Sequence, residues 1–490
     1  MNEIIKNKAC DFVIFGINGD LSKRKLLPSL YYLEKFKYIH NDTNIIGVSR
    51  SEFNIKDNIN MIKKSLLNFL KEKINNEIWL KFSKRFKFCN LDVYYSDNFI
   101  KLKKNINLKN KIIIYYFATP PNTFSYICEG LGKNKINNNN TRIIVEKPLG
   151  KNLKSYNYIN KIILKYFKEI QVYRIDHYLG KEIILNLLAL RFSNILFFSN
   201  WNNSIIDSVQ ITIFEQIGIE GRSEYFNKIG QTRDMIQNHL LQILTIITMA
   251  PPLSLNINNI NEEKIKILKS LRRIDYKNIN ENTVIGQYKS GIINNNKVNS
   301  YLEEKGINNK SNTETFVAIK ANIDNWQWLG VPFYLRTGKR LKKKIAEIVI
   351  YFKNLPINLF QKFNKNLLQN KLIIRLYPNE GIEIKILNKL YGLNNNYKLR
   401  KTKLNFNFYG KKNIHKPDAY ELLILEAMLG NQSLFVSCNE IKESWKWIDL
   451  IINGWKKKKI KPIIYKSGTW GPKESDILIE KDGRKWNKYL

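Results

Sequence analysis

The most constraining feature of this chain is a short apolar segment, Asp11–Phe15, that ends in a glycine and is followed almost at once by a helical pattern over Lys25–Phe36. This order predicts a strand, a tight turn and a helix. Within the turn, Gly16 and Gly19 permit backbone conformations that a side chain would forbid, so amide groups can approach a pyrophosphate at the positive end of the helix. The G-x-x-G pair alone is weak evidence, because the usual third glycine is absent and such pairs also occur in ordinary turns.

Further apolar segments continue the strand and helix order: Asn44–Val48, Ile112–Phe117 and Ile143–Val145. Where the first of them ends, an NAD-selective site usually offers an acidic residue to the ribose hydroxyls. This chain has Arg50 there, and a guanidinium can bind the 2′-phosphate of NADP. The sequence therefore favours NADP, with dual coenzyme use and a merely surface-exposed Arg50 as the alternatives.

The last of these segments runs into Glu146, Lys147 and Pro148. Proline forces the residue before it into an extended conformation, so Lys147 points away from any helix. Such a lysine suits a crevice at the strand ends, although a solvated loop lysine is the plainer interpretation.

The charge of the chain suggests a nucleic-acid partner, but its distribution argues against one. Among 490 residues, 81 are Lys or Arg and 42 are Asp or Glu, a formal net charge of +39. Such a balance is typical of proteins that bind anionic surfaces. Here the basic residues are spread among many Asn and Ile residues, as around Asn137–Asn140 and Asn294–Asn296, and Lys, Asn and Ile are the residues of AT-rich codons. We expect no nucleic-acid partner.

Cysteine and histidine spacings give no sign of a metal or a disulfide framework. The four cysteines lie far apart with no C-x-x-C pair, and the four histidines show no i,i+3 or i,i+4 spacing. The apolar segments around Ile183–Phe198 and Leu240–Pro252 are interrupted by polar residues, so no membrane span is expected. We expect a cytoplasmic protein without a metal.

Two segments place acid, imidazole and ammonium groups close together: R-I-D-H-Y-L-G-K-E over Arg174–Glu182 and R-D-M-I-Q-N-H over Arg233–His239. Both resemble the active-site signatures of the glucose-6-phosphate dehydrogenase family. The resemblance extends from the strand around Val13 to the S-G-T-W-G-P near Pro472.

The glycine turn also resembles the family's nucleotide-binding fingerprint, in the string F-G-I-N-G-D-L-S-K-R-K-L. Ile17, Asn18 and Ser22 stand where smaller residues are common, which affects coenzyme affinity without removing the turn. Ile285 is a second departure, because an arginine commonly precedes that glycine in the family. The resemblance implies that the coenzyme contacts come from Gly16, Gly19, Asp20, Leu21, Arg50, Asp92, Val93, Thr119, Pro120 and Lys147.

The catalytic pair follows from the chemistry that the family performs, the removal of a hydroxyl proton at C1 of a hexose phosphate. His239, with an unperturbed pKa of about 6.5, is the natural base and lies in a helical segment. Asp234 precedes it by five residues, about 140° around an α-helix, so the two side chains would not meet. Asp176 comes from a separate segment and is the preferred partner, which is also the family's arrangement.

The resemblance implies a set of substrate contacts around the sugar and its phosphate. These contacts come from His177, Tyr178, Lys181, Glu215, Asp234, Lys339, Lys344, Lys147 and Lys25. At Lys342–Lys344 the register allows a slip of one residue, and a solvated charge cluster is the alternative.

The fold expected is α/β plus α+β, with two domains. An N-terminal Rossmann-like, NADP-binding domain is predicted over 1–175. Residues 176–490 are predicted to form a larger substrate-binding domain, in which a big, mainly antiparallel sheet is covered by helices. Alternation over Ser208–Phe214, Glu347–Phe352 and Leu372–Arg375 supports the sheet. The segment Pro417–Val436 is interpreted as core and interface.

The resemblance therefore implies an oxidoreductase of carbohydrate metabolism. It oxidises D-glucose 6-phosphate with NADP to 6-phospho-D-glucono-1,5-lactone, the first oxidative step of the pentose phosphate pathway. We expect a homodimer or homotetramer, since family members dimerise through the large sheet. The alternatives are a dehydrogenase of another sugar phosphate and a non-catalytic binding protein on a decayed scaffold.

Overall fold

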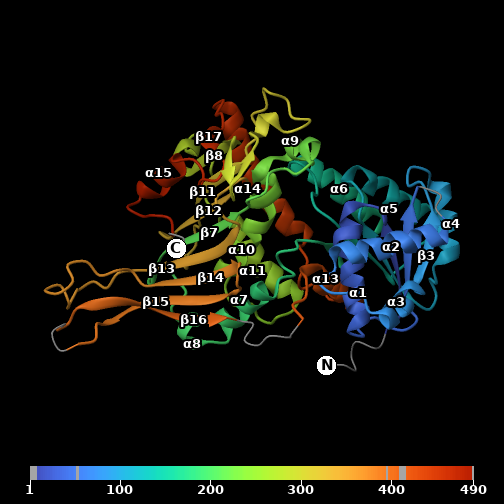
Figure 1. The fold of residues 1–490 in the computed structure, drawn as a ribbon, viewed down its shortest axis with the longest axis horizontal. Coiled ribbons are helices and arrows are strands. Elements are labelled where there is room, and N and C mark those ends of the chain that lie inside the picture. Colours follow the sequence, from blue (N-terminus) through green and yellow to red (C-terminus); the bar gives the residue numbers. More distant parts are fainter. Residues whose placement is uncertain (1–7, 51–53, 393–395, 408–414, 488–490) are drawn as a thin grey trace. The chain divides into compact units, whose positions relative to one another are not determined.

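The computed structural model describes residues 8–50, 54–392, 396–407 and 415–487 and divides the chain into two compact units (Figure 1). Unit 1 comprises Met1–Glu182, Pro252–Asn261 and His415–Lys442, and unit 2 comprises Ile183–Pro251, Glu262–Ile414 and Glu443–Leu490. The sequence, by contrast, suggested a single division near residue 175. A late segment of the chain thus belongs to the same unit as its beginning.

Unit 1 is built on a six-stranded parallel sheet in the order β3-β2-β1-β4-β5-β6. Its strands are β1 (Cys10–Phe15), β2 (Asn44–Ser49), β3 (Phe86–Asn90), β4 (Ile112–Phe117), β5 (Thr141–Val145) and β6 (Val172–Arg174). This is the doubly wound order in which the topology reverses between β1 and β4. The predicted Rossmann-like fold is confirmed.

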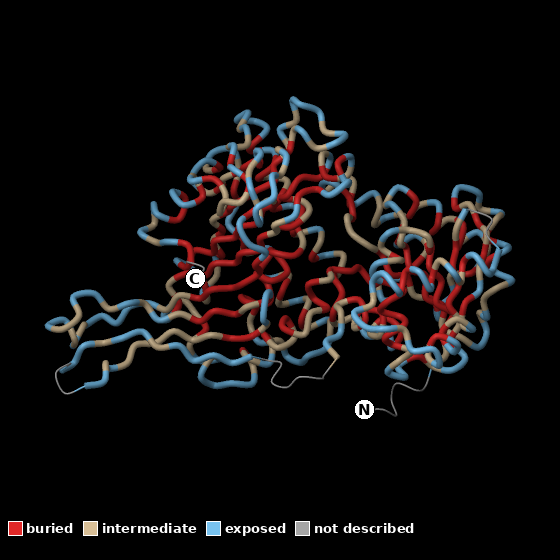
Figure 2. Tube along the Cα trace, in the orientation of Figure 1, coloured by how far each residue is buried: buried red, intermediate tan, exposed pale blue. Residues whose placement is uncertain are grey.

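Helices connect these strands, as a parallel sheet requires. They are η2 (Ser22–Leu26), α1 (Leu27–Lys35), α2 (Ile55–Phe69), α3 (Asn76–Ser83), η3 (Ser96–Asn98), α4 (Phe99–Asn105), η4 (Pro121–Thr123), α5 (Phe124–Lys133), α6 (Leu153–Tyr166) and η5 (Glu169–Gln171). Every residue of β1 is buried, which is typical of a parallel strand covered on both faces (Figure 2). Local signals set the helix starts; Asn152, for example, caps α6 by accepting a hydrogen bond from the N–H of Ser155.

The helix α13 (Ala419–Leu429) lies in unit 1 although it comes late in the sequence. Asp418 caps its first turn, and Gly430 ends it with a φ of 86°. The Arg142 guanidinium, on β5, donates hydrogen bonds to the carbonyls of Ala427 and Met428 at 2.7 and 2.8 Å. The sequence suggested Pro417–Val436 as a core segment. Its helix α13 therefore packs in the unit that carries the parallel sheet.

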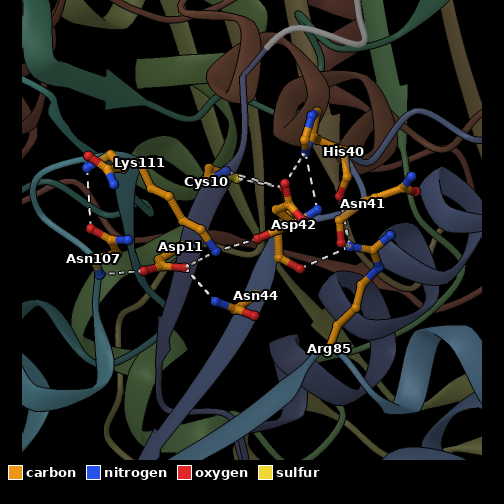
Figure 3. A network of polar contacts seen from close by, with 11 residues as sticks. Cys10, Asp11, His40, Asn41, Asp42, Asn44, Arg85, Asn107 and Lys111 are labelled. Atoms are coloured by element: carbon orange, nitrogen blue, oxygen red, sulfur yellow. Dashed lines mark hydrogen bonds and ion pairs between the residues drawn. The ribbon is translucent and has the colours of Figure 1, made fainter.

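A polar network closes the amino edge of this sheet (Figure 3). The fully buried Asp11 carboxylate accepts hydrogen bonds from the side chain of Asn44 at 2.9 Å and the backbone N–H of Asn107 at 2.7 Å. It also pairs with the Lys111 ammonium at 3.3 Å. Beside it, the Arg85 guanidinium donates to the carbonyls of the loop before β2. These groups satisfy one another.

Unit 2 is built on a nine-stranded sheet in the order β16-β15-β14-β13-β7-β12-β11-β8-β17. Its strands are β7 (Ile206–Phe214), β8 (Thr283–Lys289), β11 (Phe316–Asn322), β12 (Pro332–Gly338), β13 (Ile345–Phe352), β14 (Lys371–Tyr377), β15 (Gly381–Lys389), β16 (Leu399–Asn407) and β17 (Ile463–Lys466). All neighbours are antiparallel except β7 with β12 and β8 with β17. The three segments predicted as strands lie in β7, β13 and β14, and the predicted large, mainly antiparallel sheet is confirmed.

A small hairpin of β9 (Gly291–Ile293) and β10 (Asn296–Val298) stands apart from this sheet. Its two-residue turn has φ values of 48° at Asn294 and 65° at Asn295, the conformation of a type I′ hairpin turn.

Helices pack on the large sheet around a core that includes Phe214, Phe316 and Tyr334 (Figure 2). The helices of unit 2, including those that extend into it, are α7 (Glu182–Phe192), α8 (Ile195–Phe198), α9 (Ser223–Gln231), η6 (Thr232–Leu240), α10 (Leu241–Thr248), α11 (Ile257–Lys269), α12 (Ile279–Asn282), η7 (Tyr301–Glu303), α14 (Cys438–Lys457) and α15 (Glu474–Glu480). None of the helices in the described ranges is both long and apolar enough to cross a membrane.

Candidate active site

The glycine turn lies at the point where the topology of the unit 1 sheet reverses. Gly16 directly follows β1 with a φ of 87°, and a Cβ there would lie 2.7 Å from the carbonyl oxygen of Ala118, after β4. Only glycine fits both the conformation and the space. The N–H of Gly19 donates to the carbonyl of Gly16 at 2.9 Å, which makes the turn tight. This backbone cradle fits the pyrophosphate of a dinucleotide at a helix start.

The departures from the family's fingerprint have visible roles in this turn. The Ser22 hydroxyl donates to the Gly16 carbonyl at 2.8 Å. Ile17 is buried and packs against Gly47 of β2, where an added Cβ would lie 3.0 Å from the Ile17 side chain. Both residues support the turn, so the turn is kept although smaller residues are common at these positions. The carboxylate of Asp20 pairs with the Arg24 guanidinium at 2.6 Å on the exposed face of η2, and Leu21 is half-buried.

The other predicted coenzyme residues also follow strands of the same sheet. Arg50 comes directly after β2 and is exposed. Asp92 follows β3, and its carboxylate accepts the N–H of Tyr94 at 3.1 Å, next to the buried Val93. After β4, Thr119 hydrogen-bonds Thr123 at 2.7 Å, and Pro120 is exposed. The carboxyl ends of parallel strands share one edge, so these positions lie along one edge.

Lys147 follows β5 and is half-buried, joined to Pro148 by a cis peptide bond. Its neighbour Glu146 is a residue whose importance the sequence did not reveal. Burial raises the pKa of the Glu146 carboxyl, and the Tyr116 hydroxyl donates to it at 2.6 Å. The Tyr420 hydroxyl of α13 also hydrogen-bonds this carboxyl. A half-buried acid thus connects β4, β5 and α13 beside Lys147. The signal in the sequence was a glutamate at the end of an apolar strand.

Asp176 follows β6 in the same way and is 2% exposed. Its carboxylate accepts the backbone N–H of Tyr178 at 3.0 Å, which bends the segment back on itself. The Lys181 ammonium lies 3.9 Å from the centre of the Tyr178 ring, and the His177 ring centre lies 4.9 Å from it. The predicted phosphate-binding donors therefore form one cluster.

Two interactions anchor this segment in unit 1. The buried Arg174 guanidinium pairs with the Glu169 carboxylate at 2.7 Å. A Cβ at Gly180 would lie 2.7 Å from the carbonyl oxygen of Ala419, so only glycine allows this close approach to α13. Lys25 contacts the same helix, because its ammonium pairs with the Asp418 carboxylate at 2.8 Å.

In unit 2, Glu215 and Lys339 stand at the ends of β7 and β12, the parallel neighbours at the middle of the sheet. The Lys339 side chain is 1% exposed, and its ammonium lies 2.6 Å from the Glu215 carboxylate. A nearly buried cation held by an acid at strand ends is suited to bind a polar ligand. Lys344 behaves differently, because it is exposed and its ammonium lies 4.3 Å from the centre of the Tyr377 ring.

His239 lies in η6, which is a π-helix and not the α-helix assumed from the sequence. A π-helix joins residues five apart by hydrogen bonds, so Asp234 and His239 are one turn apart along it. The predicted separation of about 140° between the Asp234 and His239 side chains is therefore wrong, because it assumed the geometry of an α-helix. His239 is fully buried and Asp234 half-buried.

The start of this π-helix is fixed by a residue that the sequence did not single out. Gly230, with a φ of 73°, interrupts the helical conformation, and the N–H of Thr232 donates to the Glu314 carboxylate at 3.0 Å. Glu314 directly precedes the buried residues that lead into β11. No spacing in the sequence connects it with the histidine segment.

The predicted residues thus fall into two groups. Unit 1 carries all the coenzyme positions with Lys25, Lys147 and the segment from Asp176 to Lys181. Unit 2 carries Glu215, Asp234, His239, Lys339 and Lys344. The fold and these two groups of residues define a two-domain, dinucleotide-binding protein of the dehydrogenase class.

Comparisons with known proteins identify the family, and the chain belongs to the glucose-6-phosphate dehydrogenase family. Residues 13–186 match the family model described as "Glucose-6-phosphate dehydrogenase, NAD binding domain". Residues 188–487 match "Glucose-6-phosphate dehydrogenase, C-terminal domain".

Full-length relatives and solved structures agree. The chain is 57% identical over 484 residues to glucose-6-phosphate 1-dehydrogenase of Buchnera aphidicola subsp. Schizaphis graminum, covering 99% of each chain. It is 54% identical to the protein of that name from Dickeya dadantii, covering 98% of each. A solved glucose-6-phosphate dehydrogenase in complex with its substrate glucose-6-phosphate is similar with a TM-score of 0.89 at 34% identity, covering 98% of this chain and 99% of that one.

Proposed function

We propose that this protein oxidises D-glucose 6-phosphate with NADP to 6-phospho-D-glucono-1,5-lactone and NADPH. The observation that carries the proposal is the placement of the polar residues. In unit 1 each predicted coenzyme segment directly follows a strand of the parallel sheet, and in unit 2 a buried lysine and a glutamate follow two parallel strands. Residues at such strand ends bind ligands in open α/β folds. Relatives that cover the whole chain carry the name of this activity.

The NADP coenzyme, when bound, supplies the acceptor for the hydride that leaves C1 of the sugar. The chain's part in binding it is the cradle at Gly16 and Gly19, where backbone amides can approach the phosphates without steric hindrance. Arg50 follows β2, the strand after which the ribose is recognised in this fold, and its guanidinium would bind the 2′-phosphate. Thr119, Asp92 and Lys147 complete the coenzyme side of the proposal.

The proton of the C1 hydroxyl is removed by His239, and Asp176 holds the imidazole in the correct tautomer and stabilises the imidazolium that forms. This role needs a histidine shielded from bulk water, and His239 is fully buried. Loss of the proton raises electron density on the C1 oxygen, which drives the hydride away from the carbon.

The phosphate dianion is bound by His177, Tyr178 and Lys181, whose side chains cluster around one ring. Positive donors in one cluster hold a phosphate by charge-assisted hydrogen bonds. In unit 2, Glu215 and Asp234 offer acceptors for sugar hydroxyls, and Lys339 offers a further donor to the sugar phosphate. Lys344 extends the phosphate contacts, and Lys25 helps to position the substrate.

The arrangement also supports proposals about domain roles and the setting of the enzyme. Residues 1–175 would bind the coenzyme and residues 176–490 most of the substrate, with Lys25 and Lys147 as further substrate contacts. Four free cysteines, Cys10, Cys89, Cys128 and Cys438, suit a reducing cytoplasm. A homodimer or homotetramer would cover the large sheet at β16, where Leu404 and Phe406 are 55% and 62% exposed. No nucleic acid, membrane or metal takes part.

A substrate panel tests the proposal. Purified protein is mixed with NADP and one of three sugars: glucose 6-phosphate, galactose 6-phosphate or unphosphorylated glucose. We expect reduction of NADP with glucose 6-phosphate at a far higher kcat/KM than with either other sugar. The reason is that Lys181 and His177 bind the phosphate, and Glu215 and Asp234 accept hydrogen bonds from sugar hydroxyls. Equal rates with galactose 6-phosphate would assign the chain to another sugar phosphate, and no reduction with any sugar would indicate a binding protein.

A further inference from the structure

Unit 2 contains a pocket for which the proposed reaction has no use. Its volume is about 370 Å³, in the range of sites that hold small molecules. It is bounded by the end of α9, the start of η6, the strand β8, the loop before β11 and the end of α14. All of these elements belong to unit 2.

Four basic residues line this pocket: Arg233, Lys456, Lys459 and Lys461. Lysines are frequent throughout this chain, but here three of them and an arginine face one cavity. Arg233 is half-buried, and its guanidinium donates to the carbonyl of Ile229 at 2.8 Å, which fixes its position. With one acid, Glu314, among the lining residues, the pocket carries a net charge that favours an anion.

The backbone that carries these lysines is well defined. The helix α14 ends at Lys457, Lys459 follows it with a φ of 54°, and the N–H of Ile460 donates to the carbonyl of Trp455 at 3.0 Å. This left-handed ending closes the helix and turns the chain along the pocket. Lys456, in the last turn of the helix, and Lys459, just after it, both line the pocket.

The rest of the wall is mixed, because apolar side chains alternate with the polar Asn227, Asn312 and Thr313 and with the acid Glu314. Ile285, Ile452 and Trp455 are each 6% exposed. Ile285 occupies the position where an arginine is common in the family, so the wall here is uncharged. Glu314 is 9% exposed, and its carboxylate can only accept hydrogen bonds when it is ionised. A ligand that fits must combine an anion, an apolar surface and a hydroxyl or amine donor.

The pocket is joined to the segment that carries the proposed base. Glu314 accepts the N–H of Thr232, and a Cβ at Gly230 would lie 2.5 Å from its carboxylate. Arg233 is followed directly by Asp234 in the same π-helix as His239. A ligand that contacts Arg233 and Glu314 therefore contacts the two side chains whose hydrogen bonds hold the start of this helix.

From these contacts we infer that the pocket is a second ligand site, which binds a phosphate ester carrying hydroxyl groups and a flat or apolar portion. The phosphate lies among Arg233, Lys456 and Lys459, the apolar portion lies against Trp455 and Ile285, and a hydroxyl donates to Glu314. Binding stabilises the start of the π-helix.

Titration calorimetry with AMP as the probe tests this inference. The protein is first saturated with glucose 6-phosphate and NADPH, which fill the proposed active site without turnover. The titration is then repeated with unliganded protein, so that one result does not depend on the proposed function. We expect one AMP per chain, weaker binding of inorganic phosphate, and no binding of adenosine. In the double variant Lys456→Gln, Lys459→Asn, the affinity for AMP falls about tenfold or more. Asparagine is chosen at 459 because it tolerates a positive φ.

The matched control is Lys457→Gln with Lys458→Gln, which removes the same charge from the same helix end at two residues outside the pocket lining. It should keep the affinity for AMP within about twofold, because only long-range charge is lost. Both double variants should keep wild-type activity without AMP, which shows that they fold. Absence of AMP binding, or an equal loss in the two double variants, would overturn the inference in favour of general attraction to a basic surface.

Discussion

The two edges of the unit 1 sheet both carry charged side chains, yet they differ in how those charges are used. At the amino edge, Asp11 is fully buried and has three donors within 3.3 Å, all from the neighbouring strands and loops (Figure 3). At the carboxyl edge, the chain instead provides a glycine turn that holds space open and an exposed arginine. The first edge stabilises the sheet, and the second is built to bind a ligand.

Asp11 and Asp176 allow the two edges to be compared directly, because they are buried aspartates at opposite edges of one sheet. Asp11 lies at the start of β1 and Asp176 just after β6. The same substitution at both positions distinguishes a structural carboxylate from the proposed catalytic one.

The largest effect is expected for Asp176→Asn. The amide can still accept the N–H of Tyr178, so the fold should be kept, but it cannot stabilise a charged imidazolium. We expect kcat to fall about a hundredfold or more, with the affinity for glucose 6-phosphate changed less than fivefold or so. Steady-state kinetics with a separate binding titration measure both quantities. A variant with wild-type kcat would remove Asp176 from the mechanism.

The counterpart Asp11→Asn should affect stability instead. Asn44 and Asn107 donate to different oxygens of Asp11, so the amide nitrogen would face one of these two donors, and Lys111 would lose its charge partner. We expect the free energy of unfolding to fall by about 3 kcal/mol. Denaturant unfolding measures this loss, and kcat below the unfolding transition should remain that of the wild type. If kcat fell as far as in Asp176→Asn, the two edges would not differ in function.

A smaller effect is expected for Gly16→Ala, which tests whether the carboxyl edge is shaped for the coenzyme. The methyl group would lie 2.7 Å from the Ala118 carbonyl oxygen, in a conformation that costs a side chain about 1–2 kcal/mol. We expect the KM for NADP to rise about tenfold, with the KM for glucose 6-phosphate nearly unchanged. Gly221→Ala is the control, because it also has a positive φ, of 75°, but no atom within 4 Å of the added carbon. Equal effects of the two changes on the KM for NADP would contradict the assignment.

The smallest effect is expected for Arg50→Ala, which changes coenzyme preference and not turnover. Loss of the guanidinium removes one charge-assisted contact with the 2′-phosphate, so the ratio of kcat/KM for NADP over NAD should fall about tenfold. Initial rates with each coenzyme give the ratio. Arg24→Ala, another exposed arginine near the turn, should leave it unchanged; an unchanged ratio in Arg50→Ala would show that another residue selects NADP.

Much of the fold was predictable because its signals are local. Apolar segments predicted four strands of unit 1, β1, β2, β4 and β5, but not β3 or β6, and alternation predicted β7, β13 and β14. The contacts that place α13 in unit 1 could not be predicted, because Arg142 binds the carbonyls of Ala427 and Met428, nearly three hundred residues away. Apolar spacing does not encode such a contact.

The candidate site shows the same limit. The string around Gly16 predicted the turn, and its atomic fit is as expected. The π-helical geometry at His239 was not predictable, because the same residues are compatible with an α-helix and the start is fixed by the distant Glu314. Similarly, Glu215 meets Lys339 only because β7 and β12 pair in parallel, which depends on the whole sheet.

In the proposed mechanism the buried His239 of this glucose-6-phosphate dehydrogenase fold acts as the base, and the variant His239→Asn tests that role. NADP reduction is followed by absorbance at the reduced-nicotinamide band with purified wild type and variant, and glucose 6-phosphate binding is measured separately. We expect rapid reduction by the wild type, a loss of about a hundredfold or more in the variant, and retained substrate binding. Near wild-type turnover by His239→Asn would contradict it.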